Sequence, residues 1–137
     1  MRDTISKSLK RQVAQRAQFR CEYCLLSESV SFYSFHIDHV RSIKHGGLTL
    51  SENLAYCCPD CNHFKGSDIG SFSLENDESL VRFFNPRKDK WDEHFELNNG
   101  GIYGKTDIGI ATERIFKFND SDRLIFRRQL LQLSRYP

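Results

Sequence analysis

Four of the five cysteines form two pairs with the spacing of a metal site. Cys21 and Cys24 make one C-x-x-C pair, and Cys58 and Cys61 make a second pair with proline inside it. Two such pairs supply four thiolates, which suit the tetrahedral preference of Zn²⁺ and leave no open position, so we expect a structural zinc site. The alternatives are two disulfides, unliganded buried thiols, or iron in the same thiolate cage. Cys57 does not fit this spacing, and we expect it to pack as a small apolar group.

The segment between the two pairs contains side chains that could hydrolyse a phosphodiester. It places 33 residues between Cys24 and Cys58, against about 15 to 20 in a simple zinc ribbon. Asp38 could bind a divalent cation such as Mg²⁺ or Mn²⁺, and Asn62, directly after the last cysteine, could add an amide oxygen. His39 could take a proton from water as general base, because histidine changes protonation near neutral pH. The combination predicts metal-assisted phosphodiester hydrolysis.

Further polar side chains surround this set. Asn53 could hold the imidazole of His39 by a hydrogen bond. His36 lies two residues before Asp38, on the same face of a strand, and could be an additional metal or phosphate contact. His63 directly follows Asn62 and is an alternative to Asn62 as a metal ligand. The side chains that could contact DNA or its phosphates are Arg41, Lys44, His45 and Lys65.

In order along the chain, the segments CEYC, HIDHV, GG, ENL and CCPDCN closely resemble the HNH endonuclease family, over about residues 19–68. The resemblance implies a ββα-metal core, also named a His-Me finger, in an enzyme that cuts DNA to 5′-phosphate and 3′-hydroxyl ends. It assigns the general base to His39 and a metal ligand to Asp38. It also assigns the middle asparagine to Asn53 and the last position to Asn62. Because the last position is asparagine and not histidine, the chain resembles an HNN-type variant of the family.

The elements that must position these groups indicate an α+β fold. The predicted core is a ββα-metal unit pinned by the four-cysteine zinc site, with an N-terminal helix and a C-terminal extension of strands and helices. The core elements predicted from apolar periodicity are an amphipathic helix over 4–19 capped by Thr4 or Ser6, one or two short strands over Val30–Val40, and a helix that begins at Pro59 and ends at Gly66.

The C-terminal half has one clear helix and several short elements. The last helix begins after Asp120 or Ser121, and its expected apolar side holds Leu124, Ile125 and Leu131. The shorter predicted elements are a loop or exposed helix over 73–80, a strand over 91–97, a glycine-rich turn over 100–106 and a helix or strand over 108–119. We divide the chain into an HNH nuclease core with the N-terminal basic helix, 1–70, and an extension packed on it, 71–137.

Composition and charge restrict the class of protein. The 137 residues suit one domain, and 39% hydrophobic and 12% aromatic residues exclude disorder. No apolar run approaches the roughly 20 residues of a membrane helix, and no secretory signal is evident, so we expect a cytoplasmic protein. The net charge is +2, but the first 20 residues carry six basic side chains against one acidic. Residues 99–137 are basic as well. These basic ends suit a polyanion such as DNA, and the alternative is that they are ordinary solvated helix faces.

Two functions from different classes fit these observations. The first is a metal-dependent endonuclease that acts on DNA. The second is a zinc-stabilised nucleic-acid-binding or interaction module in which the hydrolytic groups are idle. The set of Asp38, His39, Asn53 and Asn62 favours the nuclease, because a binding module does not need it.

Overall fold

The computed structural model describes residues 4–74 and 78–137. Its first element is helix α1 (Lys7–Arg16), where Ser6 caps the N-terminus by accepting a hydrogen bond from the Leu9 amide at 3.1 Å. The predicted helix is therefore confirmed, with Ser6 as its cap. It ends earlier than residue 19 because Gln18 and Phe19 adopt positive φ angles of 56° and 55°, which a right-handed helix cannot include.

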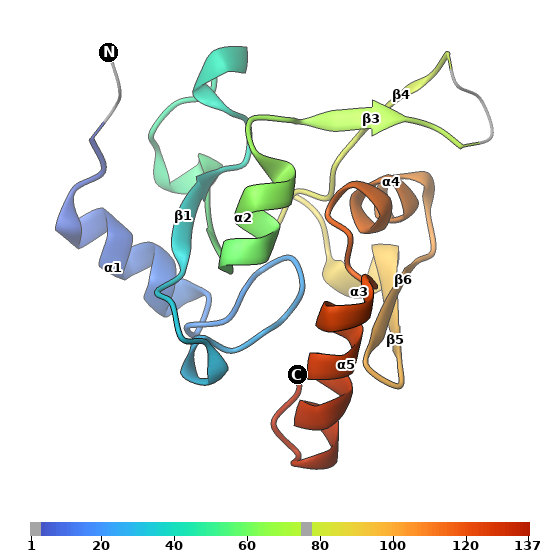
Figure 1. The fold of residues 1–137 in the computed structure, drawn as a ribbon. Coiled ribbons are helices and arrows are strands. Elements are labelled where there is room, and N and C mark those ends of the chain that lie inside the picture. The colour runs from blue at the N-terminus through green and yellow to red at the C-terminus, as the bar shows by residue number, and fades with distance from the viewer. Residues whose placement is uncertain (1–3, 75–77) are drawn as a thin grey trace.

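A two-stranded antiparallel hairpin and one helix form the predicted ββα unit. Strand β1 (His36–His39) pairs with β2 (Leu54–Cys57), with Asp38 opposite Ala55, and three 3₁₀ turns, η1 (Glu28–Val30), η2 (Ile43–His45) and η3 (Ser51–Asn53), precede or connect the strands. Val30–Val40 thus holds a single strand. Helix α2 (Pro59–Lys65) follows, begins after Cys58 and ends at Gly66, whose φ is 53°. Figure 1 shows α2 beside β1, with α1 on one side of this unit and α4 and α5 on the other.

Within residues 70–74 and 78–137, the structure has two further hairpins and three helices. Their bounds are β3 (Gly70–Phe72), β4 (Leu80–Arg82), α3 (Trp91–His94), β5 (Phe95–Asn98), β6 (Gly101–Gly104), α4 (Asp107–Ile115) and α5 (Ser121–Gln132). The strand predicted over 91–97 is wrong in its first half, which forms a helical turn. The turn predicted over 100–106 is a strand for the most part, because the reversal occurs at Asn99 and Gly100, with φ angles of 49° and 81°. The middle of the loop predicted over 73–80, residues 75–77, lies outside the described residues.

Helix α5 exists as predicted, but it buries a different face. Ile125 and Leu131 are 52% and 39% exposed, whereas Arg123 and Arg127 are 9% and 2% exposed. The two guanidinium groups are buried because they donate hydrogen bonds to backbone carbonyls, Arg123 to Phe116 at 2.6 Å and Arg127 to Gly100 at 2.7 Å. Hydrogen bonding of this kind offsets the cost of removing a charge from water.

One hydrophobic cluster contains side chains from both halves of the chain. Tyr23, from the first cysteine pair, packs its ring 5.0 Å from Phe116 and 6.4 Å from Phe84 between centroids. Phe83 and Phe118 contact Phe116 in the same way. The division at residue 70 stays a prediction, but these contacts show that the two parts share a core. Among the described residues, no helix is long and apolar enough to cross a membrane.

Candidate functional site

The two cysteine pairs meet as one closed cluster. The sulfurs of Cys21, Cys24, Cys58 and Cys61 all lie within 4.8 Å of one another, and all four side chains are buried. The Cys24 and Cys58 sulfurs are 3.6 Å apart, well beyond the roughly 2.05 Å of a disulfide bond. Four thiols at this spacing fit a tetrahedral structural metal such as zinc. Cys57 is also buried but lies outside the cluster, as expected for an apolar packing role.

Asp38 lies beneath the surface and is held at both oxygens. Tyr23 donates its hydroxyl to Oδ2 at 2.7 Å, and the Lys65 ammonium donates to Oδ1 at 3.1 Å and to the His39 carbonyl at 3.0 Å. Burial raises the pKa of the Asp38 carboxyl, and the Lys65 charge and the Tyr23 bond act against that rise. Burial and the neighbouring carboxylate also raise the pKa of Tyr23, so its hydroxyl stays protonated as a donor. These contacts fix the orientation of the carboxylate.

His39 is half-buried and is held by a threonine. Its Nε2 lies 2.9 Å from the Thr49 hydroxyl oxygen. We expected a hydrogen bond from Asn53 to this imidazole, and the structure does not form it. The Asn53 side chain bonds backbone atoms instead: its Oδ1 accepts from the Arg41 amide, and its Nδ2 donates to the Arg41 and Leu48 carbonyls, each at 2.9 Å. Asn53 therefore shapes the loop that carries Thr49.

That loop also depends on a glycine. A Cβ atom on Gly47 would lie 1.7 Å from the Arg41 carbonyl oxygen and 2.9 Å from the Asn53 amide nitrogen. No side chain fits there, because the backbone of the loop passes directly over the segment after β1. The two adjacent glycines therefore have different reasons. Gly47 is needed because the Arg41 backbone lies too close for a side chain, and Gly46 because its φ is positive, at 81°.

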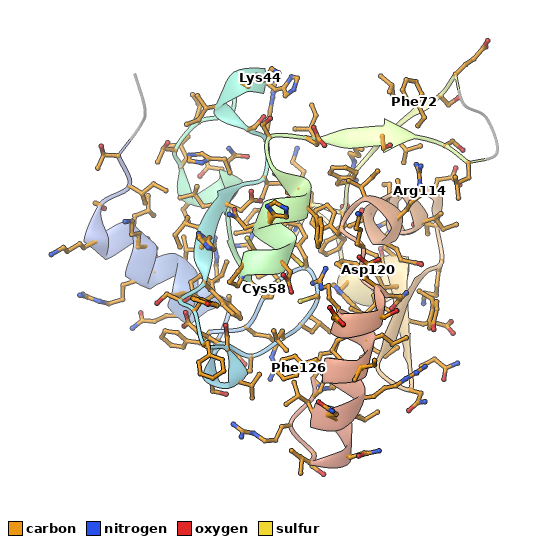
Figure 2. All side chains as sticks on the ribbon, viewed as in Figure 1. Lys44, Cys58, Phe72, Arg114, Asp120 and Phe126 are labelled. Carbon is orange, nitrogen blue, oxygen red and sulfur yellow. The ribbon has the colours of Figure 1, made fainter. Side chains whose placement is uncertain are left out.

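An open cleft of about 480 Å³ brings together five of the predicted site residues. They are His36, Asp38, His39, Lys44 and Asn62, with the hairpin on one side and α2 and the turn after it on the other. Lys44 lies in η2, the helical turn that follows β1 (Figure 2). His63 is exposed on α2, with its ring centroid 5.2 Å from that of Phe64, and is not among the described residues that line the cleft. The geometry therefore favours Asn62 over His63 as a ligand.

The remaining predicted DNA contacts lie elsewhere. Arg41 and His45 are exposed, and the Arg41 Nε donates to the His45 carbonyl at 2.7 Å. Arg41 lines a second cleft of about 360 Å³, together with Asn53 and Arg82. Lys65 is 2% exposed and paired with Asp38, so its predicted role as a phosphate contact is replaced by an internal one.

Sequence reasoning missed two residues of this site. Tyr23 lies between Cys21 and Cys24, so its position beside the cluster follows from the sequence, but its hydrogen bond to Asp38 does not. Thr49 has no comparable signal, because its partner is ten residues away and the contact depends on how the loop folds back.

Comparisons with known proteins agree with this site. The HNH endonuclease family matches residues 21–68, from the first cysteine of the cluster to just beyond α2. A curated relative, the Zorya protein ZorE of the Crooks strain of Escherichia coli, is 21% identical over 116 residues. The match covers 81% of this chain but 30% of that protein, so the chain spans less than a third of the relative's length. No solved structure is similar enough to match. Residues 21–68, which contain the four-cysteine cluster and the cleft, therefore match the HNH endonuclease domain family.

Proposed function

We propose that this protein is a metal-dependent endonuclease that hydrolyses phosphodiester bonds of DNA and leaves 5′-phosphate and 3′-hydroxyl ends. The observation that supports the proposal most is that His39 shares one open cleft with Asp38 and Asn62 inside the HNH domain. A general base and two hard oxygen ligands around one cavity are what hydrolysis of a phosphodiester requires.

In this proposal His39 is the general base and Thr49 orients it. A neutral imidazole has one nitrogen that donates and one that accepts. We assign the proton to Nε2, which then donates to the Thr49 hydroxyl oxygen 2.9 Å away. Nδ1 is left with its lone pair and can accept a proton from the attacking water. Asn53 acts indirectly, because it holds the loop on which Thr49 lies.

Asp38 and Asn62 would hold a divalent cation, Mg²⁺ or Mn²⁺. Each oxygen of a carboxylate can accept twice, so the bonds from Tyr23 and Lys65 leave capacity on Asp38 for a metal. When bound, the cation would supply positive charge that stabilises the leaving oxygen of the scissile bond. Lys65 keeps the carboxylate in position. Lys44, His45, His36 and Arg41 are exposed near the cleft or the loop behind it and are suited to contact phosphates.

A specific observation favours the second function. This is a nucleic-acid-binding module without catalysis, whose fold a structural metal such as zinc would stabilise. Both Asp38 oxygens already accept hydrogen bonds from protein donors, one of them a buried ammonium. If this ion pair persists in the presence of Mg²⁺ or Mn²⁺, the cleft would bind a nucleic acid and leave it intact.

The experiment that separates the two functions is a plasmid-cleavage assay. Supercoiled DNA is incubated with the purified chain in Mg²⁺, in Mn²⁺ and in EDTA, and nicked and linear products are counted. We expect cleavage that needs the added cation, and we expect His39→Ala to lower the rate by about 10²- to 10⁴-fold, as for loss of a general base.

The controls for this variant are its zinc content and its unfolding midpoint, which should equal those of the wild type. A His39→Ala rate equal to the wild-type rate would remove His39 from the mechanism. Binding of the plasmid without cleavage in either cation would support the module.

A further inference from the structure

Arg123, in the first turn of α5, reaches the four-cysteine cluster from outside the HNH domain. Its Nη2 lies 3.2 Å from the Cys61 sulfur and 3.8 Å from the Cys58 sulfur. Figure 2 shows Cys58 where α2 begins and Asp120 where α5 begins, so the first turns of the two helices meet at the cluster. Arg123 lies 55 positions beyond residue 68, where the matched segment ends (123 − 68 = 55).

The charge of the cluster explains why a guanidinium lies there. Four thiolates around a divalent metal carry a net charge of minus two, and a buried anion is unfavourable unless it is paired or hydrogen-bonded. A guanidinium is always protonated in proteins, so Arg123 offers the cluster both a positive charge and N–H donors. The amides of Cys24 and Cys61 supply further N–H···S contacts, to the Cys21 and Cys58 sulfurs, each at 3.4 Å.

The same side chain is fixed by contacts on its other atoms. Nη1 donates to the Phe116 carbonyl at 2.6 Å, and Nε lies 3.7 Å from a carboxylate oxygen of Asp60, next to Cys61. The C-terminus reaches the first cysteine pair as well, because the Tyr136 hydroxyl donates to the Cys24 carbonyl at 2.7 Å. The extension therefore contacts both halves of the metal cluster.

We propose that Arg123 is the outer-shell hydrogen-bond partner of the metal-bound Cys58 and Cys61 thiolates, and that the C-terminal extension thereby completes the structural metal centre. Arg123 is a positioning residue that acts through the thiolates. Because coupling between two binding equilibria is reciprocal, the metal must favour docking of α5 by the same factor by which docked α5 favours the metal. The inference is independent of the nuclease proposal, since it concerns the structural metal alone.

The test compares Arg123→Met with Arg128→Met in the full chain. Both changes remove a guanidinium from α5, but Arg128 is exposed and its Nε donates to the Asn99 carbonyl instead of to a sulfur. Zinc affinity is measured by competition with a chromophoric chelator. We expect Arg123→Met to bind zinc about 10- to 100-fold more weakly, the usual cost of losing an outer-shell partner, and Arg128→Met to match the wild type.

A second readout separates this role from simple loss of packing, which could also weaken metal binding through folding. Co²⁺ replaces zinc, and the sulfur-to-cobalt charge-transfer band is recorded. Loss of an N–H···S bond makes the sulfurs richer in electrons, so the band should move to longer wavelength in Arg123→Met and stay in place in Arg128→Met.

If Arg123→Met does not fold, Arg123→Lys carries the test, because lysine keeps the charge and loses the planar fork. A band displaced in the same direction supports the proposal. An unmoved band in a folded Arg123 variant would overturn it, whatever the change in affinity.

Discussion

His39 carries the proposed chemistry, and its orientation comes from a side chain that no sequence pattern singled out. The Thr49 hydroxyl lies 2.9 Å from Nε2, while Asn53 is occupied by the backbone of Arg41 and Leu48. Asn53, the middle asparagine of the HNH pattern, thus acts on the imidazole indirectly, because it holds the loop that carries Thr49. At the scale of the residue, the proposed general base and the group that orients it are therefore different side chains.

This arrangement predicts the effect of Thr49→Val on the cleavage rate. Valine keeps the shape and loses the hydroxyl, so the imidazole loses one hydrogen bond, which is worth about 0.5 to 1.5 kcal/mol. We expect kcat to fall roughly 2- to 13-fold with KM unchanged. Thr49→Ser keeps the hydroxyl and should retain most of the wild-type rate. Equal kcat values for the valine variant and the wild type would show that Thr49 does not orient His39.

At the scale of the element, each half of the metal cluster delivers one donor to Asp38. Tyr23 lies between Cys21 and Cys24, and Lys65 ends the helix that begins after Cys58. Because a structural metal would clamp both segments, it would also hold both donors of the carboxylate. The structural cluster and the proposed catalytic cleft are thus adjacent parts of one hydrogen-bonded arrangement.

Tyr23→Phe tests the importance of this link for stability. The change leaves the ring in the core and removes one buried hydrogen bond to a charged group, which is worth about 1.5 to 3 kcal/mol. We expect the free energy of unfolding of the metal-loaded protein to fall by that amount in urea titrations. Tyr33→Phe is the matched control, because Tyr33 is 74% exposed and should change stability by less than about 0.5 kcal/mol. Equal losses in the two variants would mean that the Tyr23 hydroxyl does not stabilise Asp38.

At the scale of the whole molecule, the HNH segment does not bury its own core. Tyr23 is fully buried against Phe84 and Phe116, and Arg123 and Tyr136 bond to the cysteine segments. All four partners belong to the C-terminal part.

A chain that ends at residue 70 tests this dependence. Without the C-terminal part it would expose the Tyr23 ring and leave the cluster without its guanidinium. We expect residues 1–70 not to fold cooperatively even with saturating zinc, whereas the full chain does, as measured by circular dichroism during thermal unfolding. A sharp, zinc-dependent transition in the shorter chain would show that residues 1–70 fold independently, as a boundary at that position implies.

Several features could be predicted because they depend on local spacing. The pairing of Cys21 with Cys24 and of Cys58 with Cys61, the helix capped by Ser6 and the helix that ends at Gly66 each follow from residues a few positions apart. For the hairpin that carries Asp38 and His39, the residue pattern predicts one or two strands without their partner, because short apolar segments do not reveal which strands pair. The pairing was expected only from the resemblance to the HNH family.

The sequence by itself determined the two cysteine pairs and the residues with chemical capability, because these depend on residue type and on spacing along the chain. The ββα order was implied by the resemblance to the HNH family. Tertiary structure alone decided that Thr49 holds His39, that Lys65 faces Asp38 instead of solvent, and that α5 buries Arg123 and Arg127 in place of Ile125 and Leu131. A buried cation looks like a surface residue in sequence, since what makes its burial favourable is an anion or a carbonyl brought close by another part of the fold.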